Sequence, residues 1–549
     1  MQHSTALADS DKKRISVPKH LIISLLTILA IGPQYFLNLS YTVNQMIIQH
    51  GLNLSTNQMA IPSILSNLAF ALGVPVGRVL SLKYGVRRIY LLFIFIFLAG
   101  SMTDIFSAGL DMLIVGRTVQ GLSAGILFLT ILPVKLRSFP NHVRHWFLFF
   151  VISGLFGSSA IGAFFGALSL NADAWRWLFV INIFSSIVCL MVGALSLPKP
   201  ETNQEGDYHI DKTGVFILTL IMAVLAVPLI HLQEEGFSSY LVWPFLMAAF
   251  FLLVLFIAID WQVVNPLVPF RALWNAKPIS GTIMAVSAHI SLIVALAGIN
   301  GFLRNNMDLP FSYLSLFYGW FFLGIVATAL FSTFFYDKWG AGVLGIIGSL
   351  LVIYVGTEWR SLDSSVSIHT LYFQVACLGS GVSMVLVSGA LGTALAGDLH
   401  QASMRSVSLH FIRNFLGALT APFLGWYAYM KNAVHYEAIR DQVDGLNPEV
   451  NSELEGMVRT FIQQGLSAAD AKSMAAYSLI ANAKRSAILG AYHDLFTIFV
   501  CLGVIMLVAS LGKTVTGKGR SLVKKEKRLL LPAPNEDQQS HDDKGDNSE

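Results

Sequence analysis

Long apolar runs alternate with short polar connections over most of this chain. A transmembrane helix needs about 20 mostly apolar residues to cross a bilayer, and about fourteen runs approach that length. The strands of an outer-membrane barrel would be about ten residues long with alternating polarity, which excludes that architecture. The pattern therefore predicts an all-α polytopic membrane protein. The runs lie near residues 21–43, 58–80, 88–108, 111–134, 146–169, 176–197, 213–232, 240–260, 279–302, 313–335, 341–357, 369–395, 406–430 and 487–511.

The composition agrees with a lipid environment. Hydrophobic residues make up 54% of the chain and charged residues 12%, whereas a soluble chain carries about 25% charged residues. The net charge of +4 is too small and too unevenly distributed to indicate a nucleic-acid partner. Cys189, Cys377 and Cys501 stand far apart in separate apolar runs, so neither a disulfide framework nor a metal site is expected.

The distribution of Lys and Arg over the connections predicts the orientation, because cytoplasmic loops carry an excess of these residues. A cytoplasmic N-terminus leaves only Arg176, Arg304 and Arg360 in the short outer loops. The basic segment 513–528 then also lies inside, so both termini are expected in the cytoplasm, with the chain in the cell (inner) membrane. The inner connections would hold Arg78, Lys83, Arg87, Arg88, Lys135, Arg137, Arg144, Lys199, Lys212, Arg271, Lys277, Lys338, Arg405 and Arg413.

Two segments are expected outside the membrane. Residues 431–484 form one long outer loop with helical periodicity, and Ser467 and Asp470 make a capping pattern before the run to Ala483. This loop is either a solvated, lid-like helical hairpin or an element of substrate recognition. The tail from Pro532 to Glu549 is acidic and polar, which is typical of disorder, and the basic stretch KGRSLVKKEKR before it suits anionic lipid headgroups.

A charged residue interrupts the fourth run, in LIVGRTVQGLSAG (113–125). Arg117 there has apolar neighbours on both sides, and a charge near a bilayer centre costs at least ~2.5–3.5 kcal/mol. Some partner must offset that cost.

The same stretch carries a family resemblance. Leu113, Arg117, Gln120, Gly121 and Ser123 resemble the fourth-helix signature of the major facilitator superfamily. The resemblance covers almost the whole chain and extends to GRVLSLKYGVRR (77–88), SAIGAFFGAL (159–168), WRWLFVIN (175–182), YDKWG (336–340) and RNFLGAL (413–419). With about fourteen spans, the chain is most similar to the fourteen-helix drug:proton antiporter family.

The resemblance implies two six-helix bundles with the substrate site between them at mid-membrane. The expected parts are a cytoplasmic tail at 1–19, an N-terminal bundle at 20–197, a linker with two extra helices at 198–277, a C-terminal bundle at 278–512 with its outer loop at 431–484, and a cytoplasmic tail at 513–549.

Three positions depart from the family pattern. The first helix usually carries an aspartate where LNLSYTVNQ (37–45) has Asn38 or Leu39, and neither can take up a proton near pH 7. Leu82 replaces an aspartate of the first-half loop, and Ala163 replaces a proline of the fifth helix. The second-half loop keeps its aspartate at Asp337. These changes leave the family intact and open the question of proton coupling.

Three partners could reach Arg117 at its depth, roughly 10 Å below the outer face. They are Asp104 of the third helix, Asn38 of the first, and a substrate anion or water in the central cavity. Arg117 is thus either a structural residue tied to the first helix or, with Gln120 of the same motif, part of the coupling or substrate site.

Proton coupling needs a titratable group in an accessible cavity. His289 lies halfway along the ninth run, with an intrinsic pKa near 6.5. It either couples transport to protons or forms a hydrogen bond with a neighbouring helix. Asp104 is the alternative coupling group.

Further candidates line the cavity or gate it. Gln34, Asn300, Tyr318 and Trp320 are the polar or aromatic candidates for the cavity wall. The candidates for the inner gate are Arg87, Arg88, Asp337, Asp398, His410 and Arg413.

These features predict a secondary exporter of amphipathic organic compounds or drugs that works by alternating access, with protons as the coupling ion. The alternative is a transporter of one metabolite, such as a siderophore or an organic anion, without obligatory proton coupling. An enzyme is not expected, because the sequence shows no paired carboxylates, metal cluster or nucleophile with its base. No Gly-x-x-x-x-Gly-Lys-Ser/Thr motif is present, so neither ATP drive nor any other cofactor is expected. The expected partners are a small-molecule substrate, protons and the lipid bilayer; nothing in the sequence bears on the oligomeric state.

Overall fold

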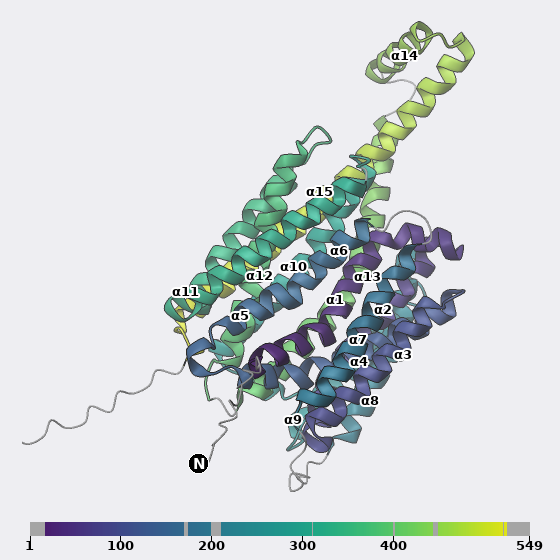
Figure 1. The fold of residues 1–549 in the computed structure, drawn as a ribbon. Helices are drawn as coiled ribbons and strands as arrows, with labels where there is room; N and C mark the ends of the chain where they lie inside the picture. Colours follow the sequence, from purple (N-terminus) through teal and green to yellow (C-terminus); the bar gives the residue numbers. More distant parts are fainter. Residues whose placement is uncertain are drawn as a thin grey trace, which may run out of the picture.

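The computed structural model describes residues 17–168, 174–198, 210–309, 311–398, 401–442, 448–519 and 521–523. Their regular structure is helical (Figure 1). The α-helices are α1 (Lys19–Leu52), α2 (Thr56–Tyr84), α3 (Val86–Ile105), α4 (Leu110–Ser138), α5 (Trp146–Val151), α6 (Gly157–Leu168), α7 (Trp177–Ser196), α8 (Lys212–Glu235), α9 (Trp243–Gln262), α10 (Ala276–Asn305), α11 (Phe311–Trp359), α12 (Ile368–Ala394), α13 (Ala402–Gln442), α14 (Pro448–Gln463) and α15 (Ala468–Val515).

The helices correspond to the apolar runs of the sequence. Twelve candidate spans are long and apolar enough to cross a membrane, and the fifth of them joins α5 and α6 through a π-helical turn at Ile152–Phe156. The helix α11 contains two expected runs, which meet at Gly340 with φ 81° and ψ 171°. The less apolar α13 contains one more run and lies outside that set. With α11 taken as two spans and α13 added, the structure agrees with the fourteen runs, and the prediction of an all-α polytopic membrane protein is confirmed.

The spans pack in two groups. In one group α2 and α3 lie along α4, α3 and α1 contact α7, and α1 packs against α6. In the other, α10 and α11 pack against α12 and α15, and α13 packs against α15. Figure 1 shows α10, α11, α12 and α15 on one side and α2, α3, α4 and α7 on the other. The exact bundle boundaries stay a prediction.

Two seams join the groups. One is formed by α5 and α6 against α11, and the other by α2 against α13. The helices α8 and α9 contact each other, and α8 also packs on α2 and α13. The two extra helices therefore cover the second seam from outside.

Glycines allow the closest helix contacts. A Cβ added at Gly77 or Gly125 of α2 and α4 would come within 2.1–2.3 Å of a backbone oxygen on the facing helix. Association in lipid depends on such close packing, because lipid tails are as apolar as leucine. The Gly and Ser content of these spans is therefore part of the packing.

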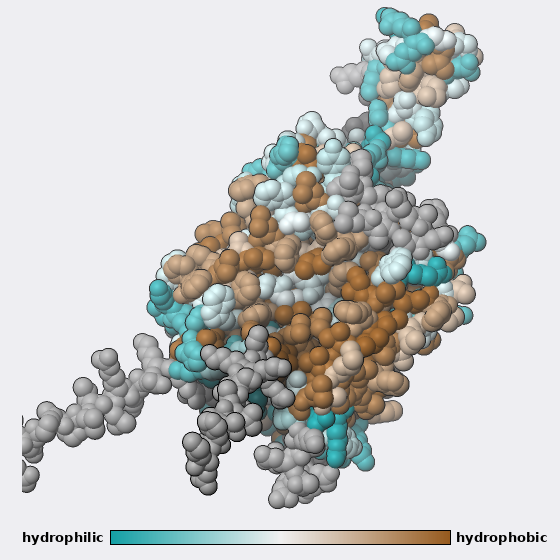
Figure 2. Space-filling view, viewed as in Figure 1, coloured by the Kyte–Doolittle hydropathy of each residue, from teal (hydrophilic) through white to brown (hydrophobic). Residues whose placement is uncertain are grey.

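The surface has the polarity of a membrane protein. Figure 2 shows a broad band of hydrophobic residues around the middle of the molecule, with hydrophilic residues at both ends. Large apolar side chains such as Phe184, Phe216 and Leu195 are exposed. Soluble proteins rarely expose so large a contiguous apolar surface, so this surface is typical of a protein in contact with lipid.

The segment 431–484 consists mainly of helix. The helix α13 continues to Gln442, α15 starts at Ala468, and α14 lies between them. Figure 1 shows these helices projecting together from one end of the molecule. The expected cap at the start of α15 is present, since the Ser467 hydroxyl accepts a hydrogen bond from the Asp470 backbone N–H.

Both ends of the described chain lie at the opposite end. His20 contacts the ring of Phe139 at a centroid distance of 5.0 Å, and Arg144 donates to the Phe139 carbonyl. Arg144 and Leu522 line the same cavity. The two ends of the described chain are therefore on the same side, as the sequence predicts, although which side faces the cytoplasm stays a prediction. The acidic tail 532–549 lies outside the described residues.

Candidate functional site

Arg117 is fully buried and has neutral partners. Its Nη2 donates to Asn38 Oδ1 at 2.9 Å, and its Nη1 donates to Gln120 Oε1 at 3.1 Å. The Tyr41 ring lies 5.5 Å from the guanidinium carbon, within the range of a cation–π contact. Asn38 of α1 therefore supplies an uncharged acceptor to Arg117. The guanidinium is hydrogen-bonded without being neutralised.

Asp104 lies nearby without a hydrogen bond to Arg117. Both of its carboxylate oxygens are buried and have no hydrogen-bond partner among the described residues. The carboxylate lies against the backbone of Gly116, where an added Cβ would come 2.1 Å from Oδ1. Gly116 thus makes room for Asp104 between α3 and α4.

The polar network continues into α2 and α3. The Gln34 amide donates to Ser66 Oγ at 3.0 Å, and the Asn38 amide donates to Asn67 Oδ1 at 3.3 Å. Gln120 in turn donates to Ser101 Oγ at 2.9 Å. Arg117, Gln120, Asn38 and Gln34, all predicted site residues, are therefore members of one hydrogen-bonded network across the first four helices.

A cavity of about 610 Å³ lies between the two groups of helices, at the end that holds the two ends of the described chain. Tyr35, Phe128 and Phe147 line it from the first group, and Leu386 and Val407 from the second. Beyond the cavity the groups are in contact, since a Cβ added at Gly319 of α11 would lie 3.8 Å from the ring of Phe164 in α6. The cavity thus opens toward one side of the membrane only.

Two predicted gate residues lie in the cavity wall. Arg413 is 3% exposed, and its guanidinium carbon is 5.7 Å from the centroid of the Phe128 ring. His410 packs edge-on to the same ring at 4.9 Å. Asp398 is exposed and lies in the connection that follows α12, where its backbone oxygen accepts from Arg405 Nη2 at 2.7 Å.

The remaining gate candidates hold other parts of the fold. The Arg87 guanidinium donates to the Ala194 carbonyl of α7, and Arg88 is exposed. The Asp337 carboxylate accepts from the backbone N–H of Leu522 at 2.9 Å and of Val523 at 3.3 Å. Leu522 is buried and lines the cavity, so Asp337 fixes a segment of the C-terminal tail at the cavity mouth.

The other wall candidates lie away from the lining of this cavity. The Tyr318 hydroxyl donates to Asn300 Oδ1, which links α11 to α10. Trp320 is 39% exposed and stacks on Tyr372 at a centroid distance of 6.4 Å. His289 lies between α10 and α13, where its Nε2 is 2.5 Å from the position of a Cβ built on Gly417. Gly417 is one helical turn from Arg413, so His289 is next to the cavity wall.

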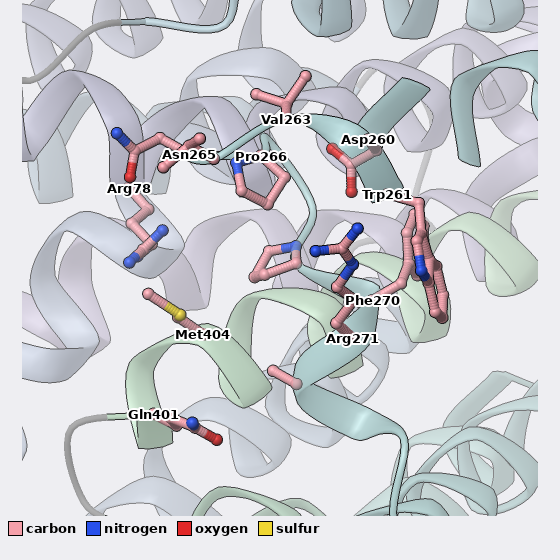
Figure 3. A pocket seen from close by; sticks show the side chains of 13 residues that line it. Arg78, Asp260, Trp261, Val263, Asn265, Pro266, Phe270, Arg271, Gln401 and Met404 are labelled. Atoms are coloured by element: carbon pink, nitrogen blue, oxygen red, sulfur yellow. The ribbon is translucent and has the colours of Figure 1, made fainter. Parts of the chain in front are cut away.

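A second pocket of about 220 Å³ lies beside the first and shares Arg78 with it. Figure 3 shows Asp260 and Arg271 directed toward one another, with Arg78 on the other wall. Oδ1 of Asp260 accepts from the Val268 backbone N–H at 3.1 Å, so this carboxylate holds the loop that follows α9. The geometry gives Asp260 a structural role.

Sequence reasoning missed Tyr35, Phe128, Arg78, Arg137 and Arg144 as cavity residues. The three arginines were counted only as signs of orientation. Phe128 and Tyr35 lie in apolar runs, and aromatic residues there are usually packing. The tertiary structure is needed to see that Phe128 and Tyr35 line a cavity, because Phe128 of α4 meets His410 of the distant helix α13.

Comparisons with known proteins agree with this architecture. The family model for the Major Facilitator Superfamily matches residues 23–423. The uncharacterized MFS-type transporter YubD of Bacillus subtilis (strain 168) is 26% identical over 514 residues, which cover 93% of this chain and 92% of that protein. The quinolone resistance protein NorB of Staphylococcus aureus (strain MW2) is 28% identical over 193 residues, 35% of this chain and 42% of the relative. The structure of the MFS proton:xylose symporter XylE bound to 6-bromo-6-deoxy-D-glucose has a similar fold, with a TM-score of 0.50, 13% identity, and coverage of 90% of this chain and 94% of that one.

The contacts of Arg117 give the first testable prediction. Replacing Asn38 by Leu removes an acceptor from a buried guanidinium, and a hydrogen bond to a charged group contributes about 1.5–3 kcal/mol. Asn38→Leu should therefore lower the thermal unfolding midpoint of the purified protein, measured by tryptophan fluorescence. Asn38→Asp is the matched control, since it keeps the acceptor for Arg117 at Oδ1 and loses only the donor to Asn67, so its midpoint should fall less than that of the Leu variant. Equal midpoints for the Leu variant and the wild type would contradict this role of Asn38.

Proposed function

This chain belongs to the major facilitator superfamily, and from that premise we propose that it exports amphipathic organic compounds by proton-coupled alternating access. Members of this family and fold are transporters and not enzymes. The relative named for quinolone resistance supports drug-like cargo, although the similarity covers 35% of this chain. The proton:xylose symporter adds support for the fold alone, at 13% identity.

One observation carries the proposal, namely the cavity between the two groups of helices. A volume of about 610 Å³ suits a drug-sized molecule. The lining is largely apolar, with a few polar groups, which is the composition expected for an amphipathic ligand. Contact at one end and a cavity at the other is the arrangement that a rocking motion of one bundle against the other would invert.

A vesicle assay tests the proposed activity. The purified protein is reconstituted into vesicles, and a panel of fluorescent amphipathic dyes is followed with and without an imposed pH gradient. We expect at least one dye to move across the membrane faster than in protein-free vesicles and to accumulate against its gradient when the pH gradient is present. Dye movement that is the same with and without protein, for every member of the panel, would refute the proposed function.

The direction of the cavity depends on the orientation of the chain. We propose that both termini and the cavity mouth face the cytoplasm, as the Lys and Arg distribution favours. In a cysteine-free background, in which Cys189, Cys377 and Cys501 are replaced, a membrane-impermeant maleimide should label Ser452→Cys in intact cells. It should label Ser521→Cys only after permeabilisation. The opposite pattern would reverse the topology.

Proton coupling is proposed to involve His289. Its position beside Gly417, one turn from the cavity residue Arg413, supports this role, since a coupling group has to respond to the state of the cavity. His289→Gln should keep dye exchange in the absence of a gradient and lose pH-driven accumulation, because Gln retains hydrogen-bonding capacity and cannot titrate.

Asp104→Asn provides the comparison, because Asp104 is the other buried titratable candidate. It should keep pH-driven accumulation if His289 couples transport. Loss of accumulation in Asp104→Asn together with its persistence in His289→Gln would transfer the coupling role to Asp104.

A further inference from the structure

We infer that the cavity binds the anionic group of its substrate at Arg413 and His410, so that the transported compounds are amphipathic organic anions. This inference rests on the proposed function and specifies the substrate class. Arg413 and His410 lie one turn apart on α13 and are both buried in the cavity wall. The side chains of Tyr35 and Phe128 face them from α1 and α4.

Arg413 has no carboxylate partner among the salt bridges of the described residues. Its Nη2 makes two long hydrogen bonds, to Tyr35 Oη at 3.4 Å and to Asn414 Oδ1 at 3.3 Å, and its Nε has no hydrogen-bond partner. A buried guanidinium that is only partly hydrogen-bonded is costly. An anion from the cavity would supply the missing acceptor.

His410 adds a second unpartnered polar atom. Its Nδ1 is buried and makes no hydrogen bond to the described part of the chain. Residues on one face of a helix recur three or four positions apart, so His410 and Arg413 present their polar atoms to the same region. An anionic oxygen bound between the two side chains would supply hydrogen-bond partners for Arg413 Nε and His410 Nδ1.

The whole cavity carries charge of one sign. Arg78, Arg137 and Arg144 line it together with Arg413, and among the described residues that line it there is no Asp or Glu. A cleft with charge of one sign and apolar walls concentrates ions of the opposite sign. An organic anion is therefore attracted to this cavity, and an organic cation is disfavoured.

The apolar residues of the cavity wall indicate the chemistry of the uncharged part of the ligand. Phe128 lies against both Arg413 and His410, and leucines at 129, 132, 386 and 391 extend the apolar surface. Such a wall accepts an aromatic or hydrocarbon body next to the charged group. A carboxylate or sulfonate with an apolar body matches both parts, since guanidinium groups bind such anions through charge-assisted hydrogen bonds.

Arg117 shows that burial alone does not make an anion site. Its Nε also lacks a hydrogen-bond partner among the described residues, but its two terminal nitrogens donate to Asn38 and Gln120 at ordinary distances, and it does not line the cavity. Arg413 combines partial hydrogen bonding with a position in the wall. Because only Arg413 of these two arginines lines the cavity, Arg413 is the one that would contact the substrate.

Two fluorescent probes with the same body and opposite charge test the inference. N-dansylglycine carries a carboxylate and dansylcadaverine carries an ammonium. Binding of each is titrated to the full-length protein in lipid nanodiscs by dansyl fluorescence, with the signal of empty nanodiscs subtracted. Wild-type protein should bind dansylglycine at least ~10-fold more tightly than dansylcadaverine, as expected from one charge-assisted hydrogen bond.

Arg413→Gln should weaken dansylglycine binding ~10-fold or more and leave dansylcadaverine binding equal or stronger. Arg413→Lys keeps the charge without the planar fork, so it should retain the preference for the anion at reduced affinity, and it serves if the Gln variant does not fold. Arg459→Gln is the matched control, because it removes one positive charge from the exposed helix α14. It should bind both probes as the wild type does.

The inference is overturned if the wild type binds neither probe, or binds the cation as tightly as the anion. It is also overturned if Arg413→Gln weakens both probes equally. The same probes in the vesicle assay separate the two proposals. Transport of both probes without preference for the anion would support the proposed function and contradict the inferred substrate class. Selective binding of the anion without transport of either probe would support the substrate class and contradict the proposed function.

Discussion

Lipid offers no hydrogen bonds to a polar side chain, so each polar group in these spans has to find its partner on the protein. The fold follows from this constraint at Arg117, whose partners lie on α1 and on its own helix. Asn38 joins α1 to α4 and, through Asn67, to α2. The N-terminal helices are thus held together by a neutral network around one charge. Such networks are conformationally specific, because each member has few other partners.

The same constraint applies to Arg413, another buried arginine. Arg413 lines the cavity, and its Nε has no hydrogen-bond partner among the described residues. The Nε of Arg117 also lacks such a partner, but the two terminal nitrogens of Arg117 are hydrogen-bonded at ordinary distances and Arg117 does not line the cavity. Among the buried cations of the described residues, Arg117 and Arg413 therefore differ in their surroundings, and the proposed anion contact belongs to Arg413. The sequence motif at Arg117 is informative, and the motif at Arg413 is much less so.

In the proposed alternating access, a motion of one group of helices against the other would change the contacts at the two seams. One seam is made by α5 and α6 against α11, and the π-helical turn at Ile152–Phe156 lies in that span. π-Helical turns often mark functional sites, because they interrupt the regular hydrogen-bond ladder. At the cavity mouth, Asp337 holds Leu522 of the tail, and Lys518 Nζ donates to the Lys338 carbonyl at 2.7 Å. The tail is thus attached to one group of helices while it lines the space between both.

The sequence by itself determined the fold class of the protein and the positions of its apolar runs. Length and apolarity of a run are local properties, so the fourteen runs, including the separate runs at 313–335 and 341–357, and the cap at Ser467 could be predicted from neighbouring residues. The motif around Arg117 also identified the family and, with Asn38, one correct contact. Only the tertiary structure decided which side chains face the cavity. Phe128 and His410 are 282 positions apart, and whether a residue on an apolar helix faces lipid, another helix or a cavity depends on the packing of helices that are distant in sequence.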